Sequence, residues 1–486
     1  MKSIKQLLYP LPVRNLTGNA DFCPTGITLD SRQVKPGMLF AALPGTQTDG
    51  HRFIPDAIRL GAGAILCEIL PEKPEPNVTY AVVTDAPRTL SHVAASYFGY
   101  PAEKLKLVGI TGTNGKTTIA TLLYRLFELL GYRSGLLSTI RVRIHNRVLP
   151  ATHTTPDAIV VNRILAEMVQ AGCDYAFMEV SSHALEQERV SGLKYSGAVF
   201  TNLTRDHLDY HPDVASYLKA KKKLFDQLSP DAFALVNADD KNGAVMLQNC
   251  RALKKTYGLR SVADYHGQMI ETGWQGTLLQ IETQEVWTRF AGRFNGSNLL
   301  AVYAVARLLG QEKEQILTTL SQLTPVEGRM EQVDLGRQIT GIVDYAHTPD
   351  ALENVLKTLT DLRKPGKQVI TVFGAGGDRD KGKRPEMAKV ACRYSDRVII
   401  TSDNPRTENP EQIIRDIEMG IPAAKRPIAL SVTRRDEAIR TAFALAQPGD
   451  VILVAGKGHE TYQEINGVRH HFDDREELEK LTKQTQ

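Results

Sequence analysis

The sequence contains no long apolar run, no cysteine pair and little net charge, and each absence excludes a class of protein. No stretch approaches the ~18 apolar residues that a membrane-spanning helix needs. The N-terminal segment, residues 1–15, has only a short apolar stretch that two prolines interrupt, so we expect neither a signal peptide nor membrane insertion. We also find no low-complexity tract and no repeat of fixed period.

The five cysteines are odd in number and far apart, and they form neither a CxxC pair nor a metal-type spacing. They are Cys23, Cys67, Cys173, Cys250 and Cys392. This usage indicates reduced thiols and a cytoplasmic protein. The net charge of +4 is small for 486 residues, which argues against a nucleic-acid-coating surface. A mild basic excess still suits anionic small substrates if the basic residues gather in one cleft.

The length predicts about three domains, and the content of 42% hydrophobic and 23% charged residues is ordinary for a globular protein. Residues 1–99 alternate strand and helix signals. A second unit, 100–329, opens with an apolar strand and ends where Pro325 and Gly328 mark a break. The third unit, 330–486, has four β-branched runs separated by helical segments, which predicts a mostly parallel sheet covered on both faces. We therefore predict an α/β fold with three domains.

The strongest local signal is a glycine-rich loop, residues 109–118, between an apolar strand and a segment with helical spacing. Glycines let backbone amides curl around phosphate oxygens, and the N-terminus of the following helix adds partial positive charge. We expect Lys116 to neutralise the β- and γ-phosphates and Thr117 to offer its hydroxyl to Mg²⁺. The spacing differs from the general GxxxxGK[ST] pattern because residue 110 is isoleucine. The order of strand, loop and helix nevertheless predicts nucleotide binding.

A second segment, residues 217–228, has the period of an amphipathic helix. At ~100° per residue its apolar stripe consists of Tyr217, Leu224, Phe225 and Leu228. Lys221 lies inside this stripe, whereas the other three lysines of the segment do not. Either Lys221 covers apolar surface with its alkyl stem, or it is held half-buried near cations so that its pKa falls. A neutral amine can take up CO₂ to give a carbamate, an anionic oxygen ligand suited to Mg²⁺.

Acidic residues and histidines follow two further predicted strands. Glu179 ends an apolar run, in the position of a metal-binding acid beside a phosphate loop. Residues 206–211 bring two aspartates and two histidines together after another strand, with a spacing that matches no standard zinc site. This segment is either a solvated, hydrogen-bonded loop or a support for Mg²⁺ through His207.

In these and other motifs the chain resembles the Mur ligase family over essentially its whole length. The motifs occur in the order expected of that family. They are TGTNGKTT, MEVSSHAL, FTNLTRDHLDYH, FNGSNLLA, EGRME, DYAHTPDAL, GAGGDRDKGKR, DNPRTE and AGKGHETY. The resemblance implies an N-terminal domain that holds a UDP moiety, a central P-loop ATPase with a parallel-rich sheet, and a Rossmann-like C-terminal domain that receives an amino acid.

The resemblance also implies the reaction. The expected activity is ATP-dependent addition of meso-diaminopimelate to the D-glutamate of a UDP-linked muramoyl dipeptide, through an acyl phosphate, in peptidoglycan precursor synthesis. The expected cofactors are ATP, a pair of Mg²⁺ ions and a CO₂-derived carbamate on Lys221. The expected partners are these small molecules, with no nucleic acid, and the expected form is a monomer.

Roles for individual residues follow from the same resemblance. The expected catalytic residues are Lys116, Glu179, His207 and Lys221, and the metal ligands are Thr117, Glu179, His207 and Lys221. The expected ATP site comprises Gly112, Thr113, Asn114, Gly115, Lys116, Thr117, Thr118, Asn295, Asn298, Arg329 and Asp344. The UDP-muramoyl dipeptide is expected to contact Leu29, Ser31, Thr46, Gln47, Thr48, Thr154, Thr155, Ser181, Gln187 and Arg189. Diaminopimelate is expected to contact Arg379, Asp403, Asn404, Pro405, Arg406, Gly456 and Glu460.

Diaminopimelate carries a second amino acid centre far from the reacting amine, and this last set of residues suits that shape. Arg406 offers a planar fork for the distal carboxylate, and Glu460 can pair with the distal ammonium. Lysine would leave Arg406 unpaired, and a site built to hydrogen-bond a group can reject analogues lacking it by roughly 10⁴–10⁵. The alternative is that residues 403–406 form only an Asn-Pro turn with a surface arginine.

Three other functions remain as alternatives. A lysine-adding sister ligase and, more distantly, a folylpolyglutamate-synthase-like ligase would catalyse related chemistry. A P-loop module that binds nucleotide without making a bond would need no cluster of Arg379, Arg406 and Glu460. Phosphate release measured with each candidate amino acid separates these alternatives.

Overall fold

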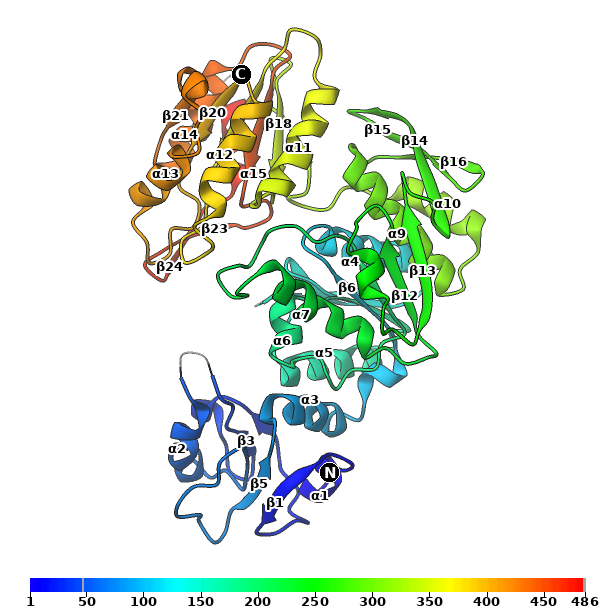
Figure 1. Ribbon diagram of the computed structural model, residues 1–486, viewed down its shortest axis with the longest axis vertical. Coiled ribbons are helices and arrows are strands. Elements are labelled where there is room, and N and C mark those ends of the chain that lie inside the picture. The colour runs from blue at the N-terminus through cyan, green and yellow to red at the C-terminus, as the bar shows by residue number, and fades with distance from the viewer. Residues whose placement is uncertain (46–47, 152, 484–486) are drawn as a thin grey trace.

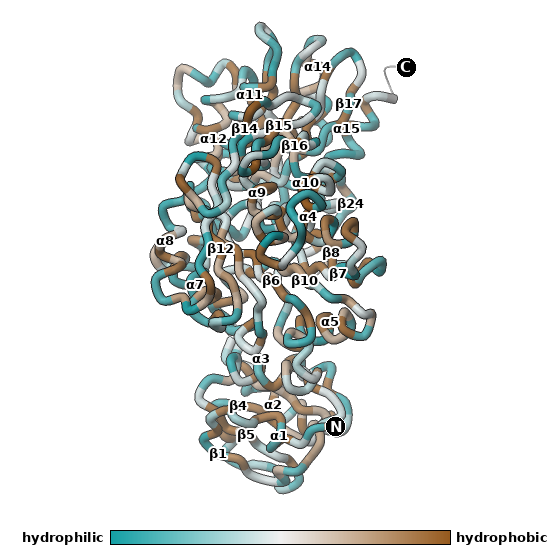
Figure 2. Tube along the Cα trace, turned by 90° about the vertical axis from the view of Figure 1, so that its right-hand side faces the viewer, coloured by the Kyte–Doolittle hydropathy of each residue, from teal (hydrophilic) through white to brown (hydrophobic). Residues whose placement is uncertain are grey.

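The computed structural model describes residues 1–45, 48–151 and 153–483. These residues form three large sheets stacked along the longest axis of the molecule, and a separate two-stranded sheet (Figure 1). The N-terminal sheet lies at one end, an eleven-stranded sheet in the middle and a six-stranded sheet at the other end. Helix α3 (Ala86–Tyr97) lies at the junction of the first two sheets in both views (Figure 2). This arrangement confirms the predicted α/β fold with three domains. Within the described ranges no helix is both long and apolar enough to cross a membrane.

The N-terminal sheet has the strand order β1-β5-β4-β3-β2, and only the edge strand β1 runs antiparallel to its neighbour. Every residue of β2 to β5 is buried, as expected for parallel strands covered on both faces. The strands are β1 (Val13–Thr17), β2 (Ile27–Thr28), β3 (Leu39–Ala41), β4 (Ala64–Cys67) and β5 (Thr79–Val83). The remaining helices are α1 (Ile4–Leu8), α2 (Ile54–Arg59) and the 3₁₀ turns η1 (Ser31–Gln33) and η2 (Gly50–Phe53).

The middle sheet has the order β16-β15-β14-β13-β12-β11-β6-β10-β7-β8-β9. Its strands from β14 to β7 run parallel, and antiparallel pairs extend both edges. The strands are β6 (Lys106–Thr111), β7 (Ser134–Leu137), β8 (Arg141–Ile144), β9 (Arg147–Pro150), β10 (Tyr175–Glu179), β11 (Gly197–Phe200), β12 (Phe233–Asn237), β13 (Leu253–Gly258), β14 (Tyr265–Gly273), β15 (Gly276–Ile281) and β16 (Gln284–Thr288). The helices are η3 (Pro101–Lys104), α4 (Lys116–Leu129), α5 (Ala158–Gln170), α6 (Ser182–Glu186), α7 (Val214–Asp226), α8 (Gly243–Met246), α9 (Arg293–Leu308) and α10 (Lys313–Gln322).

Strand β6 lies inside this sheet and alternates its side chains between two cores. Leu107 packs with residues of α5 and α7 on one face, whereas Val108 and Ile110 pack with residues of α4 and α9 on the other. The strand ends at Thr111, so the glycine-rich loop begins at the carboxyl edge of the parallel strands.

The C-terminal sheet has the order β17-β18-β22-β19-β20-β21, and only β17 is antiparallel. The four predicted strands are β18, β19, β20 and β22, so the predicted parallel arrangement is confirmed. The strands are β17 (Glu331–Asp334), β18 (Thr340–Asp344), β19 (Val369–Phe373), β20 (Arg397–Ile400), β21 (Ala429–Ser431), β22 (Val451–Ala455) and a separate hairpin, β23 (Tyr462–Ile465) with β24 (Val468–His471). Helices α11 (Pro349–Leu362), α12 (Lys383–Tyr394) and α13 (Pro410–Glu418) cover one face; α14 (Arg435–Leu445) and α15 (Asp474–Lys483) cover the other, and η4 (Ala423–Ile428) precedes β21.

The predicted amphipathic helix is α7, which begins three residues earlier than expected and ends two residues earlier. Asp213 caps its N-terminus by accepting a hydrogen bond from the backbone amide of Ser216. The apolar stripe is buried, and Lys221 lies within it as predicted, but at 1% exposure it is fully buried and not half-buried. Lys219, on the same helix, is exposed.

A buried ion pair fixes the last helix on the C-terminal sheet. Arg435 of α14 donates two hydrogen bonds of 2.7 Å to the carboxylate of Asp474, the first residue of α15, and both side chains are fully buried. The same guanidinium donates to the carbonyl of Ala455 at the end of β22, at 3.0 Å. The pair therefore joins two helices to the carboxyl end of one strand.

Replacing Asp474 by alanine is expected to lower the free energy of unfolding of the C-terminal region by ~3–5 kcal/mol, because the guanidinium would stay buried without its counter-charge. Urea denaturation followed by circular dichroism measures the change. As a control, Glu479→Ala removes only an exposed ion pair of the same helix and should change this free energy by less than ~1 kcal/mol. Equal effects of the two substitutions would contradict the structural role of the buried pair.

Candidate active site

A cavity of about 610 Å³ lies between the carboxyl edge of the middle sheet and the C-terminal sheet. Residues that follow β6, β10 and β11 line it from one side, and residues that follow β18 or lie on α11 line it from the other. Open α/β sheets bind their ligands at this edge. The cavity is therefore the candidate active site.

The loop between β6 and α4 forms one wall of the cavity. Gly112 has a φ of +147°, and a Cβ there would lie 1.8 Å from the hydroxyl of Thr201, so only glycine fits. Residues 113–118 all line the cavity. They present the N-terminus of α4, with its free amides and positive dipole end, to an anionic ligand.

Two lysines donate to the same loop carbonyl. The Nζ atom of Lys116 donates to the carbonyls of Gly112 and Thr113 at 2.9 and 2.8 Å, and Nζ of Lys221 donates to that of Gly112 at 2.8 Å. Burial lowers the pKa of Lys116, although the carboxylate of Glu179 opposes this effect. Burial also lowers the pKa of Lys221, well below its usual value, and the neighbouring Lys116 ammonium lowers it further. Lys221 is therefore disposed to be a neutral amine.

A carboxylate and an imidazole lie close to these lysines. Glu179 ends β10, is fully buried, and accepts hydrogen bonds from the Thr117 hydroxyl at 3.0 Å and from the Thr139 amide at 2.8 Å. His207 follows β11 with a left-handed φ of +56°, and burial lowers its pKa. A neutral imidazole is the form that binds a metal ion.

The donor set fits Mg²⁺ rather than a metal held by protein alone. Within the described part of the chain, no three His, Cys, Asp or Glu residues gather closely enough to hold a metal. Glu179 and His207 share the cavity with the Thr117 hydroxyl. Mg²⁺ suits this arrangement because it keeps waters and substrate phosphates as ligands besides one or two carboxylates.

Arg329 connects the start of the C-terminal sheet to the phosphate loop. Its guanidinium donates to the Thr117 hydroxyl at 3.1 Å. Its Nε atom is buried and has no hydrogen-bond partner among the residues described. A buried N–H group without an acceptor suits a phosphate oxygen, so the residues present fit a bound nucleotide.

Most of the residues predicted for ATP line this cavity. Those that do are Thr113, Asn114, Gly115, Lys116, Thr117, Thr118, Asn298, Arg329 and Asp344. Gly112 contributes its carbonyl to the two lysines instead. Asn295 is buried on α9, where its side-chain amide donates to the carbonyl of Ala291 at 2.9 Å, and it is not among the lining residues. The structure thus places Asn295 behind the cavity wall.

The residues predicted for the muramoyl peptide lie next to Glu179. The Thr155 hydroxyl donates to the Glu179 carbonyl at 2.9 Å, and Arg189 donates to the Thr155 carbonyl at 2.8 Å. The side-chain oxygen of Gln187 accepts from Nε of Arg189 at 3.0 Å and so orients the guanidinium. The cavity-lining members of this set are Thr154, Thr155, Ser181 and Arg189.

The described residues predicted for uridine diphosphate, Leu29, Ser31 and Thr48, lie in segments between strands of the N-terminal domain and do not line the cavity. Ser31 begins η1, which Asp30 caps, and Leu29 is 39% exposed. Thr48 follows β3 in the chain. Thr46 and Gln47 lie outside the described residues.

The residues predicted for diaminopimelate follow three adjacent parallel strands, β20, β19 and β22. The side-chain amide of Asn404 donates to Glu460 at 2.8 Å, and burial raises the pKa of Glu460. A Cβ on Gly456 would lie 2.4 Å from a carboxylate oxygen of Asp403, which explains the glycine. Arg406 donates to the carbonyl of Gly377 at 2.6 Å. Pro405 is buried between these residues, and Arg379 alone of the set lines the cavity.

Several residues that shape the site were not predicted from the sequence. Lys457 is fully buried and donates to Asn404 at 3.0 Å and to Glu460 at 3.3 Å. Asp350 of α11 accepts from the side-chain amide of Asn114 at 2.9 Å, across the two sheets. Both residues occur in recognised motifs, but no local pattern reveals a bond between segments so far apart in the chain.

The chain belongs to the Mur ligase family. Three family models match it: "Mur ligase family, catalytic domain" at residues 24–98, "Mur ligase middle domain" at residues 110–306, and "Mur ligase, glutamate ligase domain" at residues 328–458. Ligases of this family use ATP and Mg²⁺, form an amide bond and release ADP. The chain is accordingly an ATP-dependent amide ligase.

Its relatives match over nearly the full length. The UDP-N-acetylmuramoyl-L-alanyl-D-glutamate–2,6-diaminopimelate ligase of Bacteroides thetaiotaomicron is 54% identical over 98% of this chain and 99% of the relative. The enzyme of the same name from Geobacillus kaustophilus is 43% identical over 94% of each chain. A solved structure of a ligase of this name is similar with a TM-score of 0.69 and 34% identity, and covers 100% of this chain and 99% of the other.

Replacing Lys116 by alanine is expected to lower substrate-dependent ADP release by at least ~10²-fold, because the cavity loses the cation nearest to the phosphate loop. A coupled assay for ADP measures the loss. Lys106→Ala, at the exposed start of β6, is the matched control and should keep its activity. Undiminished ADP release by the Lys116 variant would reject the phosphate-binding role of the loop.

Proposed function

We propose that this chain adds meso-diaminopimelate to the D-glutamate of UDP-N-acetylmuramoyl-L-alanyl-D-glutamate in peptidoglycan precursor synthesis. The observation that carries the proposal is the single cavity that the phosphate loop, the Thr155–Arg189 pair and Arg379 all line. One cavity thus offers places for a nucleotide, an acidic peptide and a third reactant. The names of the relatives with 54% and 43% identity supply the chemical identity of these reactants.

The first step activates a carboxylate, since an amide does not form from a carboxylate and an amine without an input of free energy. The side-chain carboxylate of the D-glutamate attacks the γ-phosphorus of ATP, the bond to the β,γ-bridging oxygen breaks, and ADP leaves. Lys116 and Arg189 neutralise the crowded anions, and the amides of residues 113–118 hold the phosphates. Thr117, Glu179, His207 and a carbamate on Lys221 would hold Mg²⁺, which would supply further neutralisation of charge.

The second step forms the amide. The amine of diaminopimelate attacks the acyl carbon, the bond from that carbon to the phosphoryl oxygen breaks, and inorganic phosphate leaves while the amine loses its proton. No protein nucleophile is required. The residues of the chain orient the reactants and exclude water, which would otherwise hydrolyse the acyl phosphate.

The proposed carbamate is consistent with the surroundings of Lys221. Its nitrogen is buried 4.5 Å from the ring centre of Tyr217 and beside a second lysine, so the neutral amine is favoured. The nitrogen lone pair attacks the carbon of CO₂, and the amine proton is released to solvent. The resulting anion would remove the repulsion between the two lysines and add an oxygen ligand for Mg²⁺.

Lys221→Ala is expected to lower activity by at least ~10²-fold, and high bicarbonate should not restore it, because no nitrogen remains to carry CO₂. Phosphate release measures activity, and ¹³C NMR with labelled bicarbonate should show a carbamate signal in the wild type only. Lys219→Ala, exposed on the same helix, is the control and should behave like the wild type. A fully active Lys221 variant would reject the carbamate role.

The proposed selectivity for diaminopimelate depends on charge at the far end of the site. Arg406 is half-buried and follows Asp403 and Asn404 in the same loop, and Asn404 bonds both Lys457 and Glu460. We assign the distal carboxylate to Arg406 and Arg379 and the distal ammonium to Glu460 and Asp403. Asn404, Pro405 and Gly456 shape the space between these charges.

Arg406→Ala is expected to raise KM for diaminopimelate roughly 10- to 100-fold, which corresponds to the ~1.5–3 kcal/mol of a hydrogen bond to a charged group. KM for ATP should stay the same. Steady-state kinetics with each substrate varied in turn measures both constants, and the exposed Arg426→Ala serves as the control. An unchanged KM for diaminopimelate would reject this assignment.

We further propose domain boundaries at 99/100 and 329/330. In support, α3 ends at Tyr97 and β17 begins at Glu331, and the third family match begins at residue 328. We propose that the protein acts as a monomer, as the family resemblance implies. A cytoplasmic location is supported by the five cysteines, which are all free thiols.

The deciding experiment measures phosphate release with ATP, the UDP-linked dipeptide and one amino acid at a time. We expect release with meso-diaminopimelate and little with lysine. Preference for lysine would identify the sister activity. ATP turnover that ignores both the dipeptide and the amino acid would instead indicate a nucleotide-binding module.

A further inference from the structure

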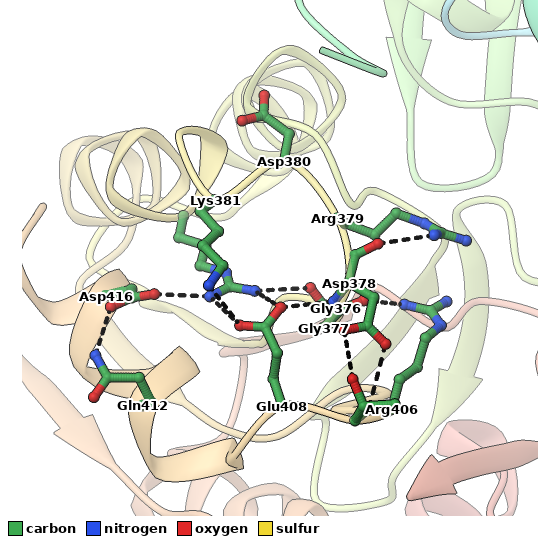
Figure 3. Close-up of polar contacts among 12 residues, drawn as sticks. Gly376, Gly377, Asp378, Arg379, Asp380, Lys381, Arg406, Glu408, Gln412 and Asp416 are labelled. Atoms are coloured by element: carbon green, nitrogen blue, oxygen red, sulfur yellow. Dashed lines mark hydrogen bonds and ion pairs between the residues drawn. The ribbon is translucent and has the colours of Figure 1, made fainter. Parts of the chain in front are cut away.

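Two loops at the carboxyl edge of the C-terminal sheet carry the arginines that the proposed function assigns to the distal carboxylate. The 376–381 loop follows β19 and carries Arg379, and the 403–408 loop follows β20 and carries Arg406. Figure 3 shows both arginine side chains on the side of the loops away from Asp416. Neither loop forms a helix or a strand over these residues, and Arg406 makes an isolated β-bridge with Ile465. The spacing of the two guanidinium groups therefore depends on how the loops are held.

Both loops contain a residue in an unfavourable backbone conformation. Asp378 has a φ of +53° and Arg406 has a φ of +51°, and both carry a side chain. Left-handed backbone at residues other than glycine persists where surrounding contacts over-determine it, and it is common at functional sites. The structure must therefore contain contacts that impose these two conformations.

Some of these contacts join the two loops directly. The Gly377 amide donates to the Asn404 carbonyl at 2.9 Å, and the Thr407 hydroxyl donates to the Asp378 carboxylate at 2.8 Å. The Arg406 guanidinium donates to the Gly377 carbonyl (Figure 3). The loops are thus fastened to one another. The 403–408 loop is also held by the β23–β24 hairpin, because the Arg406 amide donates to the Glu464 carbonyl at 3.0 Å and the Asn466 amide donates to the Arg406 carbonyl at 2.7 Å.

A buried guanidinium fastens both loops to the helices beneath them. Arg384 of α12 has no exposed side-chain surface and donates to the two carboxylate oxygens of Glu408 at 2.8 and 3.0 Å. It also donates to the Gly376 carbonyl at 3.4 Å and to Asp416 of α13 at 2.7 Å. Glu408 in turn accepts from the Asp378 amide at 2.6 Å. One side chain therefore contacts both loops and two helices.

We propose that Arg384 and Glu408 are positioning residues that fix the separation and direction of Arg379 and Arg406, and thereby set selectivity for an amino acid with a distal carboxylate. This inference rests on the proposed function. A bidentate arginine–carboxylate pair is rigid as well as strong, and a recognition site must be held within ~0.5 Å of its productive geometry. Glu408 is suited to this positioning because it accepts hydrogen bonds from Arg384 and from the backbone amide of Asp378, the residue before Arg379.

The two carboxylates on Arg384 provide a matched comparison. Glu408→Gln and Asp416→Asn each remove one charge from the same guanidinium and keep the side-chain size, whereas replacing the buried Arg384 itself endangers folding. Only Glu408 belongs to a loop that carries a recognition arginine; Asp416 contacts Arg384 and Gln412, on the helices. A purely structural role would make the two variants behave alike.

For Glu408→Gln we expect KM for diaminopimelate to rise about tenfold, the preference for diaminopimelate over lysine to fall, and KM for ATP and for the UDP-linked dipeptide to stay within twofold. Asp416→Asn should leave all these constants within twofold of the wild-type values, even if it lowers the melting temperature as much as Glu408→Gln does. Equal effects of the two variants on KM for diaminopimelate, or no effect of either, would overturn the proposal while the proposed function stands.

A double variant tests whether Glu408 acts through Arg406. If it does, Glu408→Gln should raise KM for diaminopimelate less in the Arg406→Ala background than in the wild type. Full additivity of the two changes would overturn the positioning role. If the wild-type enzyme releases no phosphate with diaminopimelate, the proposed function itself fails, and the selectivity inferred here fails with it.

Discussion

Two amines, on the half-buried Lys116 and the buried Lys221, donate to one backbone oxygen, the carbonyl of Gly112. Like charges this close repel one another, so one of them tends to lose its proton or acquire an anionic partner. The carboxylates of Glu179 and Asp206 line the cavity and offset this positive charge, and the cavity also has space for phosphate. Anionic reactants therefore lower the repulsion between the two lysines when they bind. The surrounding strands and helices hold the two lysines close together.

The same edge of the middle sheet is tied to the C-terminal sheet. Arg329 reaches the Thr117 hydroxyl, and Asn114 reaches Asp350, so the phosphate loop contacts two segments of the other sheet. These bonds involve residues that also face the cavity, so a ligand at the loop lies against the contacts that join the two sheets. The phosphate loop and the C-terminal domain are thus connected by direct hydrogen bonds.

Periodicity and motif order predicted much of this architecture. They succeeded for features that depend on residues close together in the sequence. The apolar runs gave the four parallel strands of the C-terminal sheet, and the helical period selected Lys221 among four lysines. They could not show that the side-chain amide of Asn295 donates to the Ala291 carbonyl just before α9. Nor could they identify Arg384 or Lys457 as buried. In the sequence a buried charged residue cannot be told from an exposed one, because its partners come from other segments of the chain.

The left-handed backbone at Arg406 has a consequence for how substrate preference can drift during evolution. Exchange of this arginine for a smaller residue would leave the loop bent for a group that is no longer there, since the backbone bonds of residue 406 to Glu464 and Asn466 and the pair of Glu408 and Arg384 would remain. Changing Glu408 or Arg384 first would leave an unpaired charge in the interior. A change of preference from one diamino acid to another therefore involves these anchoring residues as well as the arginine itself.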